Sequence, residues 1–357
     1  MATALTTEPT GPAPRVAAIV VNYRTPDLAL ACLRSLQRER ASLADLSIML
    51  VDGGSGDGSA DRLSDALAET PDTQTELLAL PVNGGFGYAN NQAILRLADR
   101  PMPPDYVCLV NPDALVRPGA LARLAALLDA HPDAAAAGAQ LQDEAGGLQG
   151  SAFTFPSLRG EFCRGAGTDI LRRLLAQPEP VVAPPGPAPV PWVTGAAVMF
   201  RLAALRAVGL FDEGFFLYFE EVELMHRLRA AGWQIWHDPT ARVVHAGGGS
   251  TDIKWDADGF HKQAALPRWW YHSRRRYFVR TGGRRHALLA GLAFLAGRAV
   301  WLARVRVQGR RDRFPLRTSR DTALFSWWPS RADCRAQIAH LGDAQNRRPG
   351  WMTGGAA

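Results

Sequence analysis

The chain has 357 residues, of which 47% are hydrophobic, so it can bury one large core or two smaller ones and is not a disordered chain. Its four cysteines lie far apart without a C-x-x-C pair, which argues against a disulfide framework and a zinc knuckle and favours a reducing compartment. Residues 1–15 are rich in Ala, Thr and Pro and lack the pattern of a secretion signal, so we expect a flexible leader and a cytoplasmic protein.

Charge divides the chain into two parts. From residue 255 onward, 20 Lys and Arg residues stand against 6 Asp and Glu residues, whereas residues 1–254 carry 20 against 28. Seven of the ten Trp residues also lie in the basic part. Because opposite net charges favour different partners, we expect a leader at 1–15, an α/β domain at 16–254 and a basic, Trp- and Arg-rich helical appendage at 255–357.

Short apolar runs alternate with segments of helical periodicity over residues 16–130. The runs lack polar–apolar alternation, as expected for parallel strands that are covered on both faces. In chain order, the expected strands and helices are Val16–Val21, Asp27–Arg38, Leu46–Val51, Ala60–Glu69, Glu76–Val82, Tyr88–Ala98, Tyr106–Val110 and Pro118–Ala130. These four strand–helix units predict an α/β fold with an open, mostly parallel sheet and helices on both faces.

Residues 131–190 carry weaker signals. The seven prolines from Pro178 to Pro191 indicate an extended surface connection or a flexible loop, not a core element. Farther along, Trp192–Arg201 has the composition of another buried strand. A turn at Phe211–Gly214 then precedes an acidic helix and a short strand at Trp233–Trp236.

Polar or glycine-rich residues follow the expected strands where each strand ends. Asp52 begins a glycine-rich turn, Asn83 and Gly85 follow the third strand, and Asn111-Pro112-Asp113 follows the fourth. Ligands of open α/β sheets bind outside the carboxyl ends of the strands. One such motif is often an ordinary strand-to-helix turn, but several at the same edge favour a ligand site.

Asp113 and His245 are candidate metal ligands. Asp113 directly follows a buried strand, where a carboxylate either caps the next helix or holds Mg²⁺ or Mn²⁺ together with substrate phosphates. His245 follows an apolar pair and precedes a glycine-rich run, so it is either a structural histidine or a metal ligand. Asp52, at another strand end, can accept hydrogen bonds from a nucleobase or a ribose.

Three acids, Glu220, Glu221 and Glu223, crowd one short segment that is flanked by aromatic residues. Three acids on a solvated helix face are common. Acids beside aromatic residues at the edge of a pocket can instead have a shifted pKa that suits a general base. The residues alone leave both interpretations open.

Taken together, the segments from Val16 to about Ser250 resemble glycosyltransferase family 2, the inverting enzymes of GT-A fold, and within it the bacterial rhamnosyltransferase-like branch that builds cell-surface polysaccharides. The order and spacing of the motifs carry this resemblance. It implies a divalent metal, Mg²⁺ or Mn²⁺, at Asp113 and His245 and a catalytic acid pair at Glu220 and Glu221. It also implies nucleotide-sugar contacts at Asn22, Tyr23, Asp52, Asn83, Gly85, Phe86, Asn90, Asn111, Thr194 and Gly195.

The implied reaction is a single displacement that inverts the anomeric carbon of the donor sugar. Glu221 would take a proton from a hydroxyl of a saccharide or lipid-linked acceptor, and the metal would stabilise the departing nucleoside diphosphate. Two positions depart from the family pattern. Gly53 stands where the family usually has Asn, and Glu221 stands where it usually has Asp.

The basic C-terminal part contains an apolar run of eleven residues, Ala287–Gly297. A spanning helix needs about 20 apolar residues, so this run is too short. Residues 285–307 either lie in the membrane interface with their arginines at the headgroups or pack on the α/β domain with a solvated basic face. The interface alternative places the protein on the inner face of the cytoplasmic membrane. No nucleic-acid recognition motif accompanies the arginines, so we expect no nucleic-acid partner.

Two other functions share some of these features. A nucleotidyltransferase that makes sugar nucleotides would share the fold class and the metal, but Asn22-Tyr23-Arg24-Thr25 lacks the glycines of a phosphate loop. A catalytically inactive sugar-nucleotide-binding protein is the second alternative, because Glu replaces Asp in the acid pair.

Overall fold

The computed structural model of the protein describes residues 13–246, 265–309, 311–326 and 328–352. Most of the predicted leader, the glycine-rich run after His245 and the predicted boundary at 254/255 lie outside these residues. The first elements are β1 (Val16–Asn22), α1 (Pro26–Glu39), β2 (Leu46–Asp52), α2 (Ser59–Glu69), β3 (Thr75–Ala79), α3 (Phe86–Ala98), β4 (Tyr106–Val110), β5 (Ala114–Val116) and α4 (Ala120–Ala130). All four predicted strand–helix units are confirmed, and β5 is an additional short strand.

The remaining strands complete two sheets. They are β6 (Ala134–Gln142), β7 (Ala152–Phe153), β8 (Val181–Val182), β9 (Ala188–Val190), β10 (Trp192–Val193), β11 (Ala197–Arg201) and β12 (Gln234–His245). The main sheet has the order β3-β2-β1-β4-β11-β6-β12-β5, with β9 paired to β12, and β10-β7-β8 form a small second sheet. The strands β1 to β4 are parallel, and β11 is antiparallel to both of its neighbours. This arrangement confirms the predicted α/β class with an open sheet.

One predicted strand was wrong, and one strand of the main sheet was not predicted. The segment Trp192–Arg201 is not one strand, because β10 pairs with β7 in the small sheet and β11 pairs with β4 in the main sheet. The break lies at residues 194–196, where the chain turns from one sheet to the other. The weak stretch after residue 130 contains β6, a strand in the middle of the main sheet. Its run of alanines is buried but offers none of the bulky residues by which strands are recognised.

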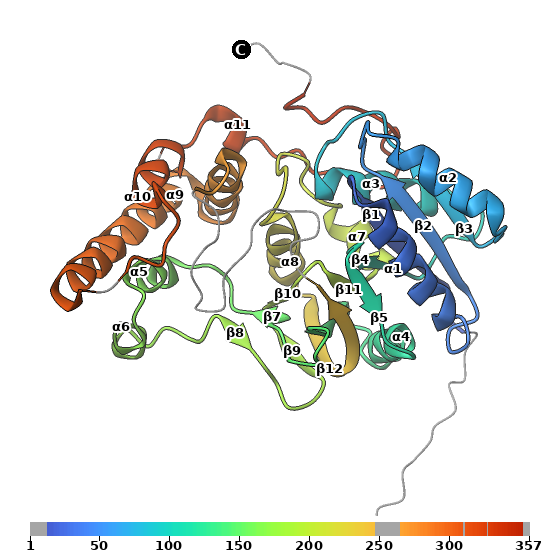
Figure 1. The fold of residues 1–357 in the computed structure, drawn as a ribbon, viewed down its shortest axis with the longest axis horizontal. Coiled ribbons are helices and arrows are strands. Elements are labelled where there is room, and N and C mark those ends of the chain that lie inside the picture. The colour runs from blue at the N-terminus through green and yellow to red at the C-terminus, as the bar shows by residue number, and fades with distance from the viewer. Residues whose placement is uncertain (1–12, 247–264, 310, 327, 353–357) are drawn as a thin grey trace, which may run out of the picture.

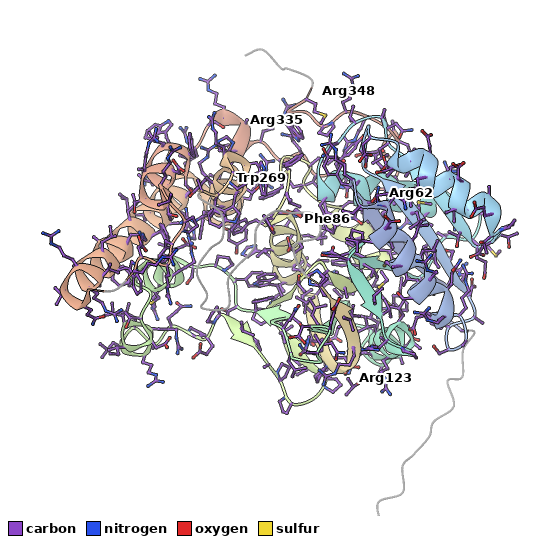
Figure 2. The ribbon with its side chains drawn as sticks, viewed as in Figure 1. Arg62, Phe86, Arg123, Trp269, Arg335 and Arg348 are labelled. Atoms are coloured by element: carbon purple, nitrogen blue, oxygen red, sulfur yellow. The ribbon has the colours of Figure 1, made fainter. Side chains whose placement is uncertain are left out.

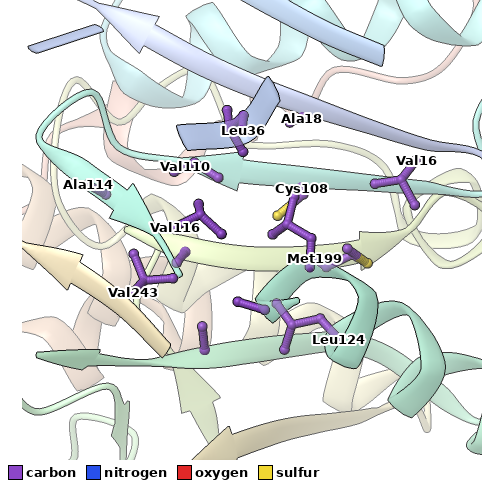
Figure 3. Packing of buried hydrophobic residues seen from close by; sticks show 14 of the residues in the cluster. Val16, Ala18, Leu36, Cys108, Val110, Ala114, Val116, Leu124, Met199 and Val243 are labelled. Atoms are coloured by element: carbon purple, nitrogen blue, oxygen red, sulfur yellow. The ribbon is translucent and has the colours of Figure 1, made fainter. Parts of the chain in front are cut away.

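Alternate residues of the central strands face two different helical layers. Ala18 of β1 belongs to one core together with Leu36 of α1 and Leu124 of α4, as Figure 3 shows. The next residue, Ile19, belongs to the other core together with Tyr88 of α3. Burial on both faces explains why these strands lack polar alternation. Each large apolar side chain buried in this way stabilises the fold by about 1.5–3 kcal/mol.

The other helices are α5 (Leu158–Ala166), α6 (Asp169–Leu174), α7 (Leu202–Val208), α8 (Glu220–Ala230), α9 (Arg268–Gln308), α10 (Thr318–Asp321), the π-helical turn η1 (Thr322–Ser326) and α11 (Arg331–Cys334). In Figure 1, α5, α6, α9 and α10 gather on the side of the molecule away from α1 and α2. Helices α5 and α9 cross closely: a Cβ on Gly165 would lie 2.3 Å from the Phe294 carbonyl oxygen, and a Cβ on Gly297 would lie 2.1 Å from that of Phe162. The basic part of the chain therefore packs on a helix that precedes residue 254.

Helix α9 is longer than the apolar run predicted. It spans 41 residues, with a break in its helical backbone at Gly283. Within the described residues it is the one helix long and apolar enough to cross a membrane by length and composition, and one third of its 18-residue apolar window is buried. A core helix of a soluble protein can meet the same two criteria, so this finding does not distinguish the two alternatives for residues 285–307.

Candidate active site

A pocket of about 860 Å³ lies at the carboxyl ends of the parallel strands. The ends of β1 and β4, the turns after β2 and β3, the turn before β11, the start of α8, the end of β12 and the residues that lead into α9 form its wall. Most of the predicted site residues line it: Tyr23, Asn83, Gly85, Phe86, Asn111, Asp113, Thr194, Gly195, Glu220, Glu221 and His245. The topology thus brings segments that are far apart in the sequence to one place.

Asp113 and His245 lie side by side in this pocket. Strand β12 pairs with β5 so that His245 lies opposite Ala114, the neighbour of Asp113. Asp113 Oδ1 lies 3.3 Å from His245 Nε2, and Asn111 Nδ2 lies 3.4 Å from the same nitrogen. No cluster of three His, Cys, Asp or Glu side chains suited to a metal occurs in the described parts of the chain. A carboxylate beside an imidazole fits Mg²⁺ or Mn²⁺ where substrate phosphates complete the shell.

Glu220 and Glu221 are the first two residues of α8, and both line the pocket. Among the residues that the structure describes, Oε2 of each carboxylate is buried and has no hydrogen-bond partner. Burial raises the pKa of Glu220 well above its usual range, and the charge of Glu221 adds to this effect. Burial also raises the pKa of Glu221, against backbone hydrogen bonds that include one from Gly195. A carboxylate with a raised pKa is suited to accept a proton near neutral pH.

Glu223, the third candidate acid, has a different role. Its two oxygens accept hydrogen bonds from Arg227 Nε at 3.0 and 2.9 Å, and the same guanidinium donates to the carbonyls of Val208 and Leu210. Glu223 is buried and does not belong to the described lining of the pocket. Arg227 therefore ties α8 to the chain at the end of α7, and Glu223 holds the guanidinium of Arg227 in place. The choice of a general base narrows to Glu220 and Glu221.

The loop before α8 is strained and tightly anchored. Tyr218 and Phe219 have left-handed backbone angles, with φ of 65° and 69°. Such angles are costly for bulky residues and persist only where the surroundings impose them. At the start of this loop, the buried carboxylate of Asp212 accepts hydrogen bonds from Arg276 at 2.7 and 2.9 Å, which tie the loop to α9.

Gly85 allows the same loop to dock on the sheet. Its φ is +91°, and a Cβ at this position would lie 1.9 Å from the Phe216 carbonyl oxygen. That oxygen accepts a hydrogen bond from the Phe86 N–H at 3.1 Å. A glycine is required here because the backbone that delivers the two glutamates passes directly over it.

Three residues predicted to contact the nucleotide sugar lie beneath the pocket wall. Asp52 is buried and accepts hydrogen bonds from Asn22 Nδ2 at 2.8 Å and from Ser55 Oγ at 2.6 Å. Asn90 Nδ2 donates to the Phe86 carbonyl at 2.9 Å. Asn22, Asp52 and Asn90 are not in the described lining, and their contact with a nucleotide stays a prediction. In this structure they order the turns that do reach the pocket.

The sequence analysis missed one wall of the pocket. Phe216, Leu217 and Tyr218 contribute from the loop before α8, and Pro267 and Trp269 contribute from the start of α9. Trp269 and Phe86, both labelled in Figure 2, belong to α9 and α3 and line the same pocket. The aromatic residues beside Glu220 were a usable signal for the loop. Nothing local in the sequence assigns Trp269, because only tertiary packing brings α9 to the strand ends.

Comparison with known proteins gives the family. Residues 17–167 match the family model for glycosyl transferase family 2. An N-acetylglucosaminyl-diphospho-decaprenol L-rhamnosyltransferase of Mycobacterium tuberculosis is 33% identical over 227 residues, which cover 59% of this chain and 71% of that protein. The rhamnosyltransferase WbbL of Escherichia coli is 26% identical over 167 residues, covering 45% and 60%.

Solved structures support the fold. A mannosyltransferase from Pyrobaculum calidifontis, solved in complex with GDP-Man and Mn²⁺, superposes with a TM-score of 0.51 at 17% identity and covers 87% of this chain and 78% of that one. GalNAc-T7, solved with UDP, GalNAc and Mn²⁺, gives a TM-score of 0.52 at 13% identity and covers 78% and 52%. These similarities show a shared GT-A-like fold. The sequence relatives and the motifs at the strand ends show that the chain belongs to glycosyl transferase family 2 and is a glycosyltransferase of rhamnosyltransferase-like type.

Proposed function

We propose that the chain transfers rhamnose from a nucleoside-diphosphate sugar to the sugar of a lipid-linked diphosphate acceptor, with inversion at the anomeric carbon. The observation that carries this proposal is one pocket lined both by the Asp113–His245 pair and by two glutamates with raised pKa, the buried Glu220 and the half-buried Glu221. The choice of rhamnose and of a lipid-linked acceptor follows the name of the relative from Mycobacterium tuberculosis.

Glu221 is the proposed general base. Its carboxylate takes the proton of the acceptor hydroxyl while that oxygen forms a bond to the anomeric carbon. The bond from this carbon to the diphosphate breaks, and the electron pair leaves with the nucleoside diphosphate. Glu221 adjoins the Gly195 turn between the two sheets, whereas Glu220 is more deeply buried, which favours Glu221 for contact with substrate.

Asp113 and His245 are the proposed ligands of Mg²⁺ or Mn²⁺. When bound, the ion supplies positive charge that offsets the charge of the leaving diphosphate. Asn111 lies against His245 and orients its ring, as neighbours of metal ligands commonly do. Tyr23, Asn83, Phe86, Thr194 and Gly195 form the rest of the proposed donor wall, and Asp52 fixes the turn beside it.

Peripheral contact with the inner face of the cytoplasmic membrane is part of this proposal. An apolar stripe on α9 is exposed, with Leu289 at 50%, Leu292 at 40% and Leu302 at 44% exposure. Arg285 and Arg306 are exposed near its two ends. Apolar residues flanked by arginines suit an anionic lipid surface, where a lipid-linked acceptor would reside. Flotation with anionic vesicles at low salt tests this contact, and a protein that stays at the bottom of the gradient contradicts it.

A screen of nucleoside-diphosphate sugars tests the reaction. With Mn²⁺ present, the donor is expected to raise the melting temperature, because a ligand at tens of times its dissociation constant stabilises a protein by roughly 2 kcal/mol. The same donor should then be consumed with a short-chain prenyl-diphosphate sugar as acceptor. A protein that binds the donor but neither transfers its sugar nor hydrolyses it would instead be an inactive binding protein. Synthesis of the sugar nucleotide would identify a nucleotidyltransferase.

A further inference from the structure

The wall of the pocket nearest the C-terminal helices is aromatic. The rings of Tyr218 and Trp269 are stacked, with centroids 5.7 Å apart and planes inclined by 26°. The ring of Phe216 meets that of Trp269 edge to face at 6.0 Å. All three residues line the pocket and remain partly exposed.

This aromatic wall is held in place from behind. Phe216 also contacts Trp351 near the end of the described chain, with ring centroids 5.8 Å apart. The Trp351 indole N–H donates to the Glu213 carbonyl at 3.0 Å, in the same loop that carries Phe216 and Tyr218. Tyr218 keeps its left-handed backbone in spite of the steric cost. Several independent contacts therefore fix the wall, as expected for a preformed binding surface.

The other parts of the pocket leave this wall for the acceptor. Asp113 and His245 suit the diphosphate of the donor, and the turns after β1, β2 and β3 suit its nucleoside. The two glutamates follow Tyr218 within three residues, so an acceptor hydroxyl that reaches them brings its sugar ring to the aromatic side. The C–H face of a sugar ring is weakly positive and is attracted to the negative face of an aromatic ring.

We propose that Trp269 and Tyr218 form an acceptor subsite that binds the sugar ring next to the attacking hydroxyl. This subsite rests on the proposed glycosyl transfer. It identifies the part of the molecule that recognises the acceptor. Trp269 belongs to α9, outside the residues matched by the family model, so this recognition is built by the C-terminal region of this chain.

The test compares Trp269→Ala with Trp269→Phe, using N-acetylglucosaminyl diphosphate on a short prenyl chain as acceptor and the donor found in the screen. Trp269→Ala should raise the KM for the acceptor about 2- to 12-fold, the range expected for one aromatic contact. Trp269→Phe keeps an aromatic ring, so its KM for the acceptor should stay close to that of the wild type. The Kd of the donor and its hydrolysis without acceptor should change less than about 2-fold. Trp328→Ala, which removes a 70% exposed Trp that is not in the described lining, is the matched control.

A second variant guards against misfolding of the first. Tyr218→Asn removes the other ring but tolerates the left-handed backbone, because Asn adopts positive φ more readily than other non-glycine residues. It should raise the acceptor KM in the same direction. The subsite is overturned if the KM for the acceptor is unchanged in both variants. It is also overturned if the affinity for the donor falls as much as the affinity for the acceptor.

Binding measurements separate this inference from the proposed function. Titration of the same acceptor by calorimetry should give weaker binding to Trp269→Ala than to the wild type whether or not transfer occurs. A wild-type protein that binds the acceptor but never transfers a sugar contradicts the proposed function and leaves the subsite standing. A wild-type protein that transfers sugar, with acceptor binding unaffected by Trp269→Ala, contradicts the subsite alone.

Discussion

The two sides of the pocket are positioned by different means. On one side, Asn111 and Asp113 follow a central strand, and the backbone hydrogen bonds of the sheet fix their place. On the other side, Glu220 and Glu221 follow a strained loop that is held by buried side chains from α9 and by contacts from residues beyond it. The strand side could be derived from sequence periodicity, and the loop side depends on tertiary contacts. Because of this difference, the start of α9 forms part of the pocket wall.

The largest predicted effect concerns the strand side. Chelation by EDTA should abolish transfer and Mg²⁺ or Mn²⁺ should restore it, and Asp113→Asn should lower kcat by roughly 10³-fold, because a metal ion contributes several kcal/mol to charge stabilisation. Asp45→Asn is the control, since Asp45 is exposed and lies just before β2, at the edge of the sheet away from the pocket. Activity that is insensitive to chelation would remove the metal from this account.

The next effect concerns the anchor of the loop side. Arg276→Met leaves the fully buried Asp212 carboxylate without its main partner and should destabilise the protein by about 3 kcal/mol in urea unfolding. The control is Arg62→Met, which breaks the exposed pair with Asp27 and should change stability by less than about 1 kcal/mol. Equal losses in the two variants would show that the Asp212 anchor has no special role.

A smaller effect is expected at the point where the two sides meet. Gly85→Ala places a Cβ against the Phe216 carbonyl and should displace the loop, lowering kcat about 10- to 100-fold. Gly119→Ala has a similar φ of +78° but no atoms within 4 Å of the added Cβ, so it isolates the cost of the backbone angle. If both variants keep full activity, close docking of the loop is not needed for catalysis.

The smallest effect concerns stability and pH. Glu220 has a folded-state pKa raised by burial, so its stabilising contribution is present at low pH and is lost as pH rises from about 4 through the raised value. Glu220→Gln should therefore raise the melting temperature more at pH 8 than at pH 5. A gain of about 1 kcal/mol in the free energy of unfolding corresponds to a rise of roughly 2–4 °C in the melting temperature of a domain of this size. A difference between variant and wild type that does not change with pH would contradict the burial of this charge.

Local pattern was sufficient for the strand side of the molecule. The position of Asp113 after a buried strand and that of His245 after an apolar pair predicted the edge of the sheet at which both residues lie, and both line the pocket there. The strand β6 could not be predicted, because alanines in a central strand carry no periodic signal. The role of Glu223 also could not be predicted. Its spacing from Arg227 is visible in the sequence, but the sequence does not show that Glu223 is buried away from the pocket. Trp269 depends on the packing of α9 against the rest of the chain.

The most direct test of this account is the donor affinity and transfer rate of Glu221→Gln beside those of Glu220→Gln. Removal of a general base lowers the rate by about 10²–10⁴-fold, so Glu221→Gln should lose at least about 100-fold in kcat while its Kd for the donor stays within about 2-fold of the wild type. Glu220→Gln should keep more of its activity. Near wild-type turnover in Glu221→Gln would contradict the assignment of Glu221 as the base.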